Sequence, residues 1–183
     1  MNFYELELLG LKRELPIIAV GRRTKLARFS LLGDVELVNA LADEWAKRLK
    51  KYKFDCLVAP EVSVLPLVHG VALRLGHKRF VVCRKNIRPY MISPVEIKPL
   101  AHFPKHVEPL VISGQDAEYL KGKKVAIFDD VVSTGVTMRM VGKLIEKVGA
   151  EVVLRIAVLR QGEQFDKMEN FLYLGELPIF HNE

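Results

Sequence analysis

The residues best suited to chemistry lie in residues 123–138, where an apolar run leads into two acids and then into a short turn. The acids are Asp129 and Asp130, and the turn reads Ser133-Thr134-Gly135-Val136-Thr137. A turn of this kind at the start of a helix offers free backbone N–H groups, hydroxyl donors and the positive end of the helix dipole, which suit a phosphate. Two carboxylates beside a phosphate would repel it unless they face a ribose diol or the water shell of Mg²⁺.

An ordinary strand-to-helix turn capped by Asp, Ser and Thr is the main alternative for this stretch. Caps alone require neither two adjacent acids nor four small or hydroxylated residues in one turn. The phosphate-binding pattern G-x-x-x-x-G-K-[ST] and the dinucleotide pattern G-x-G-x-x-G are both absent from the sequence. We therefore interpret residues 129–137 as a binding site for a phosphate together with a diol or Mg²⁺.

The elements that must position this site follow an alternation of apolar, strand-like runs with helical patterns, which is typical of a parallel sheet covered on both faces. Ligands of such sheets bind just past the carboxyl ends of the strands, so we expect both acids at a solvent-facing strand end. Gly76 and Gly149 are expected to end two of the helices. The fold class is α/β, with residues 1–183 forming a single domain around a mostly parallel, twisted sheet flanked by helices. Strands are expected at residues 15–20, 56–59, 79–84, 110–112, 125–128 and 152–159, and helices at residues 34–49, 65–75 and 134–148.

Composition agrees with one ordinary globular domain. The chain has 183 residues, of which 50% are hydrophobic and 27% charged, and its net charge is +6, so anions are the more natural partners. Cys56 and Cys83 each lie in an apolar run and are read as reduced, buried thiols. The N-terminus has no secretory pattern and the most apolar stretch, residues 62–75, is too short to cross a bilayer. We expect a cytoplasmic protein that has no membrane partner.

Three further segments have alternative interpretations. Residues 85–109 are punctuated by proline and lack periodicity, which indicates a functional or mobile loop. His102 and His106 are spaced like a metal pair, but ordinary loop histidines are favoured because Pro104 lies between them. A cluster of basic residues is read as a solvated face or a phosphate-facing rim, and nucleic acid is not expected as a partner. That cluster consists of Arg22, Arg23, Lys25 and Arg28.

The segment 128–137 resembles the phosphoribosyl-pyrophosphate (PRPP) motif of type I phosphoribosyltransferases, in which four apolar residues precede two acids and a T-G-x-T turn. The resemblance extends over residues 31–159. It is closest to the adenine phosphoribosyltransferase branch, through Leu31-Leu32-Gly33-Asp34, Val58-Ala59-Pro60-Glu61 and Phe80-Val81-Val82-Cys83-Arg84-Lys85.

The resemblance implies an enzyme that transfers the phosphoribosyl group of PRPP to a purine base, with adenine as the best single choice, and releases pyrophosphate. It assigns catalytic roles to Asp129, Asp130 and Arg84, and it implies Mg²⁺ near the two acids, held through PRPP. Residues 87–109 would form a flap that closes over the reacting centre. PRPP would be bound by Asp129, Asp130, Ser133, Thr134, Gly135, Val136 and Thr137, and its pyrophosphate by Pro60, Glu61, Val62, Ser63, Arg84 and Lys85.

Two readings of the function remain open. The branch's Tyr-x-Leu-Glu-Tyr-Gly-like flap string has no counterpart here, and its base-pocket string falls on residues 25–30 without matching them. These departures favour, as the alternative, a PRPP-binding regulator or sensor without turnover, or an enzyme for another base. The apolar run 171–180 must pack on the core or against a second subunit, and a homodimer is expected because the family is commonly dimeric.

Overall fold

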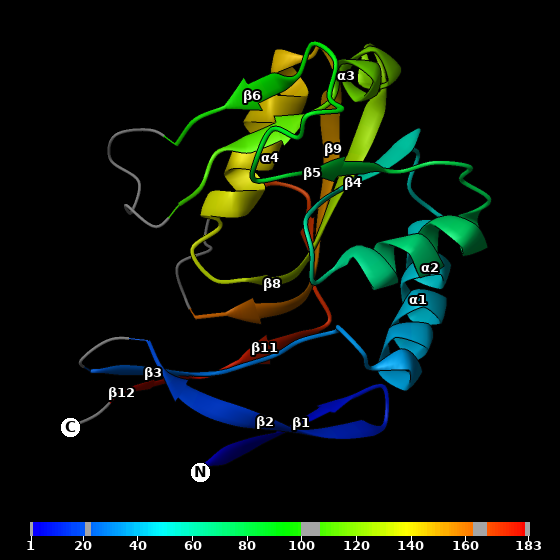
Figure 1. Cartoon of the computed structure of the whole chain (residues 1–183). Helices are drawn as coiled ribbons and strands as arrows, with labels where there is room; N and C mark the ends of the chain where they lie inside the picture. Colours follow the sequence, from blue (N-terminus) through cyan, green and yellow to red (C-terminus); the bar gives the residue numbers. More distant parts are fainter. Residues whose placement is uncertain (1, 21–22, 100–106, 163–167, 182–183) are drawn as a thin grey trace.

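A six-stranded sheet, in which every strand pair is parallel, forms the centre of the molecule (Figure 1). The computed structural model describes residues 2–20, 23–99, 107–162 and 168–181. The strand order is β10-β9-β8-β4-β5, with β11 also paired to β9. The strands are β4 (Cys56–Pro60), β5 (Val81–Cys83), β8 (Lys124–Val132), β9 (Glu151–Gln161), β10 (Phe171–Leu172) and β11 (Gly175–Leu177). The predicted α/β class with a parallel sheet is confirmed.

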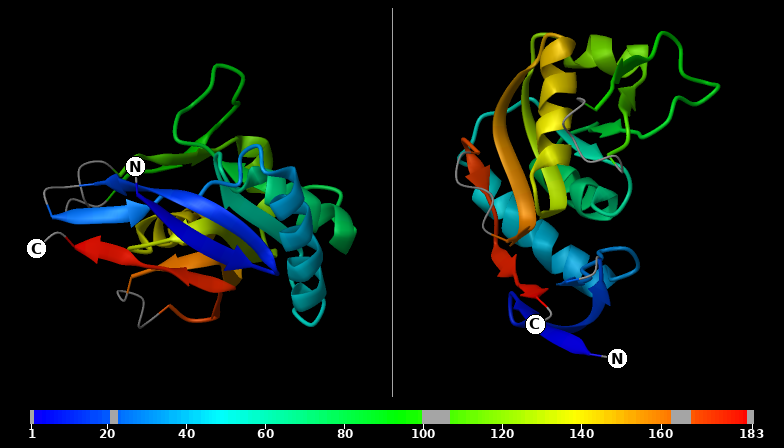
Figure 2. Two further views of the ribbon diagram at one scale, coloured as in Figure 1. Left: turned by 90° about the horizontal axis from the view of Figure 1, so that it is seen from below. Right: turned by 90° about the vertical axis from the view of Figure 1, so that its left-hand side faces the viewer.

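Helices cover both faces of this sheet, as the uniformly apolar strands require. All five residues of β4 are buried. One face packs against α1 (Val35–Leu49) and α2 (Leu65–Leu75), and the other face packs against α4 (Val136–Lys147). The views in Figures 1 and 2 show α4 on the opposite side of the sheet from α1 and α2.

The helix α1 begins where its capping residue predicts. The carboxylate of Asp34 accepts a hydrogen bond from the backbone N–H of Leu37 at 3.0 Å, which satisfies one free donor of the first turn. Leu37, Leu41 and Trp45 then repeat at a spacing of four residues and are fully buried against the sheet. The helix α2 ends at Gly76, whose φ of +76° only glycine adopts without strain.

A smaller antiparallel sheet lies at the end of the molecule where both chain termini are found (Figures 1 and 2). The sequence predicted only part of it, as one strand at residues 15–20. Its members alternate between buried and exposed side chains, so each short strand gives a weak apolar signal. The strands, in spatial order, are β1 (Phe3–Leu8), β2 (Leu11–Ala19), β3 (Thr24–Ala27) and β12 (Ile179–His181).

The strand at residues 110–112 was expected to extend the parallel sheet, and this expectation is wrong. β7 (Leu110–Ile112) pairs antiparallel with β6 (Val95–Ile97) in a separate two-stranded sheet. A backbone bridge between Arg84 and Val111 joins this pair to the end of β5. The short helix α3 (Gly114–Leu120) follows β7. A run of three apolar residues predicts a strand but not its partner, which is why the sequence placed it in the wrong sheet.

The apolar C-terminal run packs on this chain's own core. β10 and β11 pair with β9, and β12 pairs with β3, so the run joins the two larger sheets. Cys56 and Cys83 are buried and free, as expected. Within the described residues, no helix is long and apolar enough to cross a membrane.

Candidate active site

The two acids lie inside β8, close to its carboxyl end. β8 continues to Val132, farther than the sequence predicted, and β9 pairs with it at Asp129 through Ala157. As a result, only 8% of Asp129 is exposed, whereas Asp130 is half-buried. The expectation that both acids face solvent is therefore wrong for Asp129, because β8 continues past it to Val132 and it lies within the sheet rather than at the strand end.

Burial makes Asp129 a perturbed carboxyl group. Its pKa is raised well above the ordinary value of 3.8, first by loss of hydration and second by the negative charge of Asp130. The Asp129 Oδ1 atom accepts the backbone N–H of Asp130 at 2.9 Å, and Asp130 Oδ1 accepts that of Val131 at 2.8 Å. Two adjacent acids held in this way are suited to a ligand that brings hydroxyl groups or a cation.

The turn after β8 forms a compact seat at the start of α4. Gly135 is the helix N-cap with φ of +69°, a conformation that favours glycine. Arg139, one turn into α4, donates a hydrogen bond from Nη2 to the carbonyl oxygen of Thr134 at 2.7 Å, which stabilises the conformation of the turn. A cavity of about 50 Å³ is lined by Asp129, Val131, Val132, Ser133, Thr134, Gly135, Val136, Thr137 and Met138.

A larger cavity of about 400 Å³ is lined by segments that are distant in the sequence and that meet at one edge of the sheet. Among the residues predicted for the site, Arg84, Val62, Ser63 and Gly135 do not line this larger cavity, although Gly135 lines the smaller one. The lining residues are Pro60, Glu61, Lys85, Val107, Glu108, Leu110, Asp129, Asp130, Val131, Ser133, Thr134, Val136, Thr137 and Met140. The sequence prediction placed residues 87–109 near the reacting centre as a flap, but it assigned no site residue in the 107–110 segment. Its signal was a carboxylate, Glu108, directly before an apolar run.

Glu61 connects the loop after β4 with the loop after β5. Its Oε1 accepts the backbone N–H of Lys85 at 2.9 Å, and its Oε2 lies 3.5 Å from Nη1 of Arg84. Its own backbone N–H donates to the carbonyl of Cys83 at 2.9 Å. The peptide bond between Glu61 and Val62 is cis. The Glu61 carboxylate therefore contacts the Arg84 guanidinium and the Lys85 backbone, and it fixes the loop that follows β5.

Those cations differ in their surroundings. Arg84 is held by its backbone, which exchanges hydrogen bonds of 2.8 and 2.7 Å with Val111, and by the carboxylate of Glu61. Lys85 reaches into the cavity, where its Nζ forms an ion pair of 2.6 Å with Oε2 of Glu108. The side chains of this pair are 48% and 51% exposed, so solvent and salt reach both partners.

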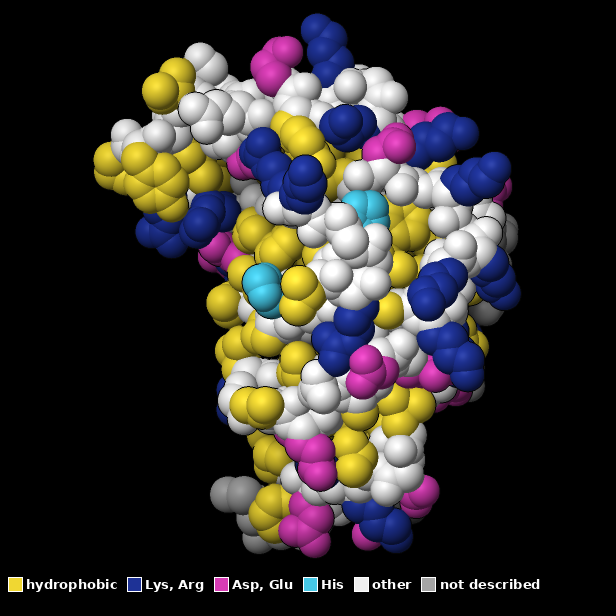
Figure 3. Space-filling view, turned by 90° about the vertical axis from the view of Figure 1, so that its right-hand side faces the viewer, with side chains coloured by type: hydrophobic (Ala, Val, Ile, Leu, Met, Phe, Trp, Pro, Cys, Tyr) yellow, Lys and Arg dark blue, Asp and Glu magenta, His cyan; other side chains and the backbone are white. Residues whose placement is uncertain are grey.

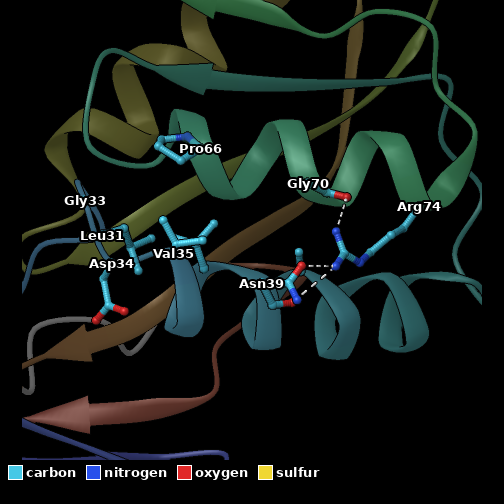
Figure 4. Close-up of a pocket in the computed structure, with 10 residues that line it drawn as sticks. Leu31, Gly33, Asp34, Val35, Asn39, Pro66, Gly70 and Arg74 are labelled. Carbon is cyan, nitrogen blue, oxygen red and sulfur yellow. Dashed lines mark hydrogen bonds between the residues drawn. The ribbon is translucent and has the colours of Figure 1, made fainter.

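Two other cavities lie apart from these acids. One, of about 310 Å³, is lined by Arg28, Phe29 and Ser30 of the expected base-pocket segment, together with residues of β2 and the start of α1. The other, of about 190 Å³, lies between α1 and α2, where Arg74 donates to Asn39 and to the carbonyl of Gly70 (Figure 4). Figure 3 shows this side of the molecule, with apolar side chains among many lysines and arginines. His102, His106 and Arg22 lie outside the described residues.

Comparison with known proteins agrees with this arrangement. The family model described as "Phosphoribosyl transferase domain" matches residues 32–173. Adenine phosphoribosyltransferase of Thermosipho melanesiensis is 31% identical over 126 residues, which cover 67% of each protein. HGPRTase-like protein 3 of Haloterrigena turkmenica is 36% identical over 129 residues, or 70% of this chain and 64% of that protein.

Solved structures show the same fold. The adenine phosphoribosyltransferase of Thermoanaerobacter pseudethanolicus superposes with a TM-score of 0.64 at 28% identity, over 80% of this chain and 84% of that one. The site therefore combines paired acids with a turn suited to a phosphate at the carboxyl edge of a parallel sheet. With this fold and these matches, the chain belongs to the phosphoribosyltransferase family. Within it, the chain is a type I enzyme of the adenine phosphoribosyltransferase-like branch.

Proposed function

We propose that this enzyme transfers the 5-phosphoribosyl group of PRPP to a purine base, adenine first, and releases pyrophosphate in purine salvage. The observation that carries the proposal is the 400 Å³ cavity, because it unites the paired acids, the turn before α4, and Glu61 and Lys85 from neighbouring strand ends. In the reaction, the bond between the anomeric carbon and the pyrophosphate oxygen breaks. A bond to a base nitrogen forms, and the proton of that nitrogen passes to the released pyrophosphate or to water.

The ribose and its 5-phosphate would be bound by β8 and the turn after it. Asp129 and Asp130 accept hydrogen bonds from the 2′ and 3′ hydroxyl groups, and the turn from Ser133 to Thr137 donates to the phosphate at the positive end of α4. Gly135 allows the turn to adopt a φ of +69° without strain, and this turn presents its backbone N–H groups to the phosphate. This assignment is supported by the 50 Å³ cavity, which is lined by Asp129 and by the turn from Ser133 to Thr137.

The departing pyrophosphate would be stabilised by the cations after β5. Negative charge develops on the leaving group as its bond breaks, so the positive charges of Arg84 and Lys85 would lower the barrier by electrostatic stabilisation. The Pro60-Glu61-Val62-Ser63 loop would also bind the pyrophosphate, and the hydrogen bond from the backbone N–H of Lys85 to Glu61 joins this loop to the segment that carries the cations. The closing flap at residues 87–109 stays a prediction, and residues 100–106 of it lie outside the described residues.

Magnesium is part of the proposal, and the oxygen donors of the cavity fit it. Mg²⁺ prefers oxygen ligands and binds through one or two carboxylates plus substrate phosphates rather than in an all-protein cage. The ion would be held through PRPP near Asp129 and Asp130, whose carboxylates line the cavity, and the described residues contain no cluster of three or more His, Cys, Asp or Glu that could hold a metal alone. When bound, the ion would neutralise charge on the pyrophosphate.

We further propose a cytoplasmic homodimer. The two buried, unpaired thiols support a reducing compartment. A second copy is supported by apolar side chains on the α1 and α2 face, where Val35 is 79% and Leu73 is 70% exposed. Light scattering should give twice the chain mass of 20.8 kDa, and a monomer would refute the homodimer.

The experiment that tests the function is pyrophosphate release from PRPP and Mg²⁺ on separate addition of adenine, hypoxanthine, guanine, xanthine, uracil and orotate. Adenine is supported by the names of several relatives, whereas the HGPRTase-like relative supports a 6-oxopurine. Release with adenine confirms the proposal, and release with another base corrects the substrate. Binding of PRPP without release from any base would establish the sensor alternative.

A further inference from the structure

We propose that Glu108 is the counter-ion of Lys85 before PRPP binds and that the pyrophosphate group displaces it, so that Glu108 weakens the affinity of the site for pyrophosphate. The inference rests on the proposed function and adds to it a residue that the sequence did not assign. It depends on the charges that line the cavity and on two carboxylates with different surroundings.

The cavity is rich in acids for a site that binds an anion. Among the residues that the structure describes, its lining carries four carboxylates, from Glu61, Glu108, Asp129 and Asp130, and one ammonium group, that of Lys85. Oε2 of Glu108 lies 2.6 Å from that ammonium group, which is therefore already paired. Pyrophosphate entering the cavity must compete with Glu108 for the same cation, and the two anions repel each other at contact distance.

Glu61 is not displaced in the same way, because its carboxylate accepts a hydrogen bond from a backbone N–H group. It accepts the N–H of Lys85, which stays in place whatever the lysine side chain does, and it lies beside the Arg84 guanidinium. Its side chain is only 16% exposed, against 51% for Glu108. Glu61 is thus a fixed support for the loop, whereas Glu108 is joined to the cavity cation by one exposed ion pair.

The proposed competition acts at one end of the substrate. Lys85 follows β5, beside the loop after β4, whereas the turn that seats the 5-phosphate follows β8. Removing the Glu108 charge should therefore favour ligands that carry pyrophosphate and leave a ligand with only the 5-phosphate nearly unaffected. A general change in surface charge would alter the binding of both kinds of ligand.

The test is calorimetric titration of wild type and Glu108→Gln with PRPP, inorganic pyrophosphate and ribose 5-phosphate, each in the presence of Mg²⁺. Glu118→Gln is the matched control, because it removes the same charge from an exposed position on α3, outside the predicted flap, and Glu118 does not line the cavity. We expect Glu108→Gln to tighten PRPP and pyrophosphate about two- to fivefold at low salt, as for exposed ion pairs, with less effect at high salt. Ribose 5-phosphate should bind equally to all three proteins.

Steady-state kinetics provides a second readout. Glu108→Gln should lower KM for PRPP without raising kcat, because the stronger hold on pyrophosphate persists until the product leaves. Weaker or unchanged pyrophosphate binding in Glu108→Gln would overturn the proposal, and so would an equal gain in Glu118→Gln. Failure of the wild type to bind PRPP would instead refute the proposed function, so the two failures are distinguishable.

Discussion

Asp129 combines a functional position with an unfavourable environment. Its carboxyl group is 8% exposed, and its pKa is raised well above the ordinary value by burial and by the adjacent Asp130. Between its ordinary pKa and the raised one, the folded protein binds a proton that the unfolded chain releases. The free energy of unfolding therefore falls as pH rises through that interval.

Asp129→Asn should remove this penalty while it abolishes PRPP binding. At pH 7 we expect a Tm a few degrees above that of wild type. Below about pH 4 the Tm values of the two proteins should converge, because the Asp129 carboxyl group of wild type is then protonated in both the folded and the unfolded state. Thermal unfolding across that pH range checks the prediction. A lower Tm for Asp129→Asn at pH 7 would show that the carboxylate stabilises the fold rather than serving the ligand.

Sequence reasoning at this scale identified the residue types but not their environments. The acid-acid-turn pattern was visible because the residues are contiguous, and so were Glu61 and Lys85 through the family resemblance. The burial of Asp129 was not visible, because it depends on how far β8 extends beside β9. The pairing of Lys85 with Glu108 was hidden because their 23-residue separation is closed only by the tertiary fold.

At the scale of elements, the entry to α1 couples the small sheet to the main domain. Arg13 of β2 donates to both carboxylate oxygens of Asp34, at 2.6 and 3.0 Å, and to Glu36 at 2.7 Å. The hydrogen bond from Arg13 is the first cause that lowers the pKa of Asp34. The same carboxylate caps the helix, so one side chain fixes both the start of α1 and its contact with β2.

Asp34→Ala should reduce the free energy of unfolding by about 1–2 kcal/mol, the usual effect of losing an N-cap acceptor. Asp34→Asn is the control, because it keeps a capping oxygen and removes only the charge. Since the folded pKa is lowered, the contribution of the charge is present above about pH 4 and is lost as pH falls through the folded value. Urea unfolding at pH 7 and at low pH checks this, and an equal loss in both variants would contradict the capping role.

The helices of the main domain could be predicted because their signals are local. Asp34, Gly76 and Gly149 mark helix ends within a few residues of the observed bounds. The pairing of strands could not be predicted in the same way, because it depends on tertiary packing between segments that are distant in the sequence. The three apolar residues of β7 were assigned to the wrong sheet for this reason, and the seven-residue α3 has too few turns to show a clear period.

At the scale of the whole molecule, the C-terminal segment connects the two larger sheets. β11 extends the main sheet beside β9, and β12 closes the small sheet beside β3. Leu177 of β11 is 3% exposed within the core shared by α1, α2 and the small sheet. The end of the chain therefore contributes to stability rather than trailing from the domain.

Leu177→Ala should lower the free energy of unfolding by about 2–4 kcal/mol, as expected for a truncated core leucine. Ile179→Ala is the matched control on β12, because Ile179 is 37% exposed and should lose much less. Urea denaturation measures both. Equal losses would mean that the segment does not bury Leu177 as the structure shows.

The measurement that tests the central claim most directly is the affinity of wild type and of Asp130→Asn for PRPP in the presence of Mg²⁺, determined by titration calorimetry. Asp130 is half-buried at the cavity, so the variant should fold normally. We predict that wild type binds PRPP and that Asp130→Asn binds it at least about tenfold more weakly, through loss of charge-assisted hydrogen bonds. Equal affinity in the two proteins, or no binding by the wild type, would contradict the site.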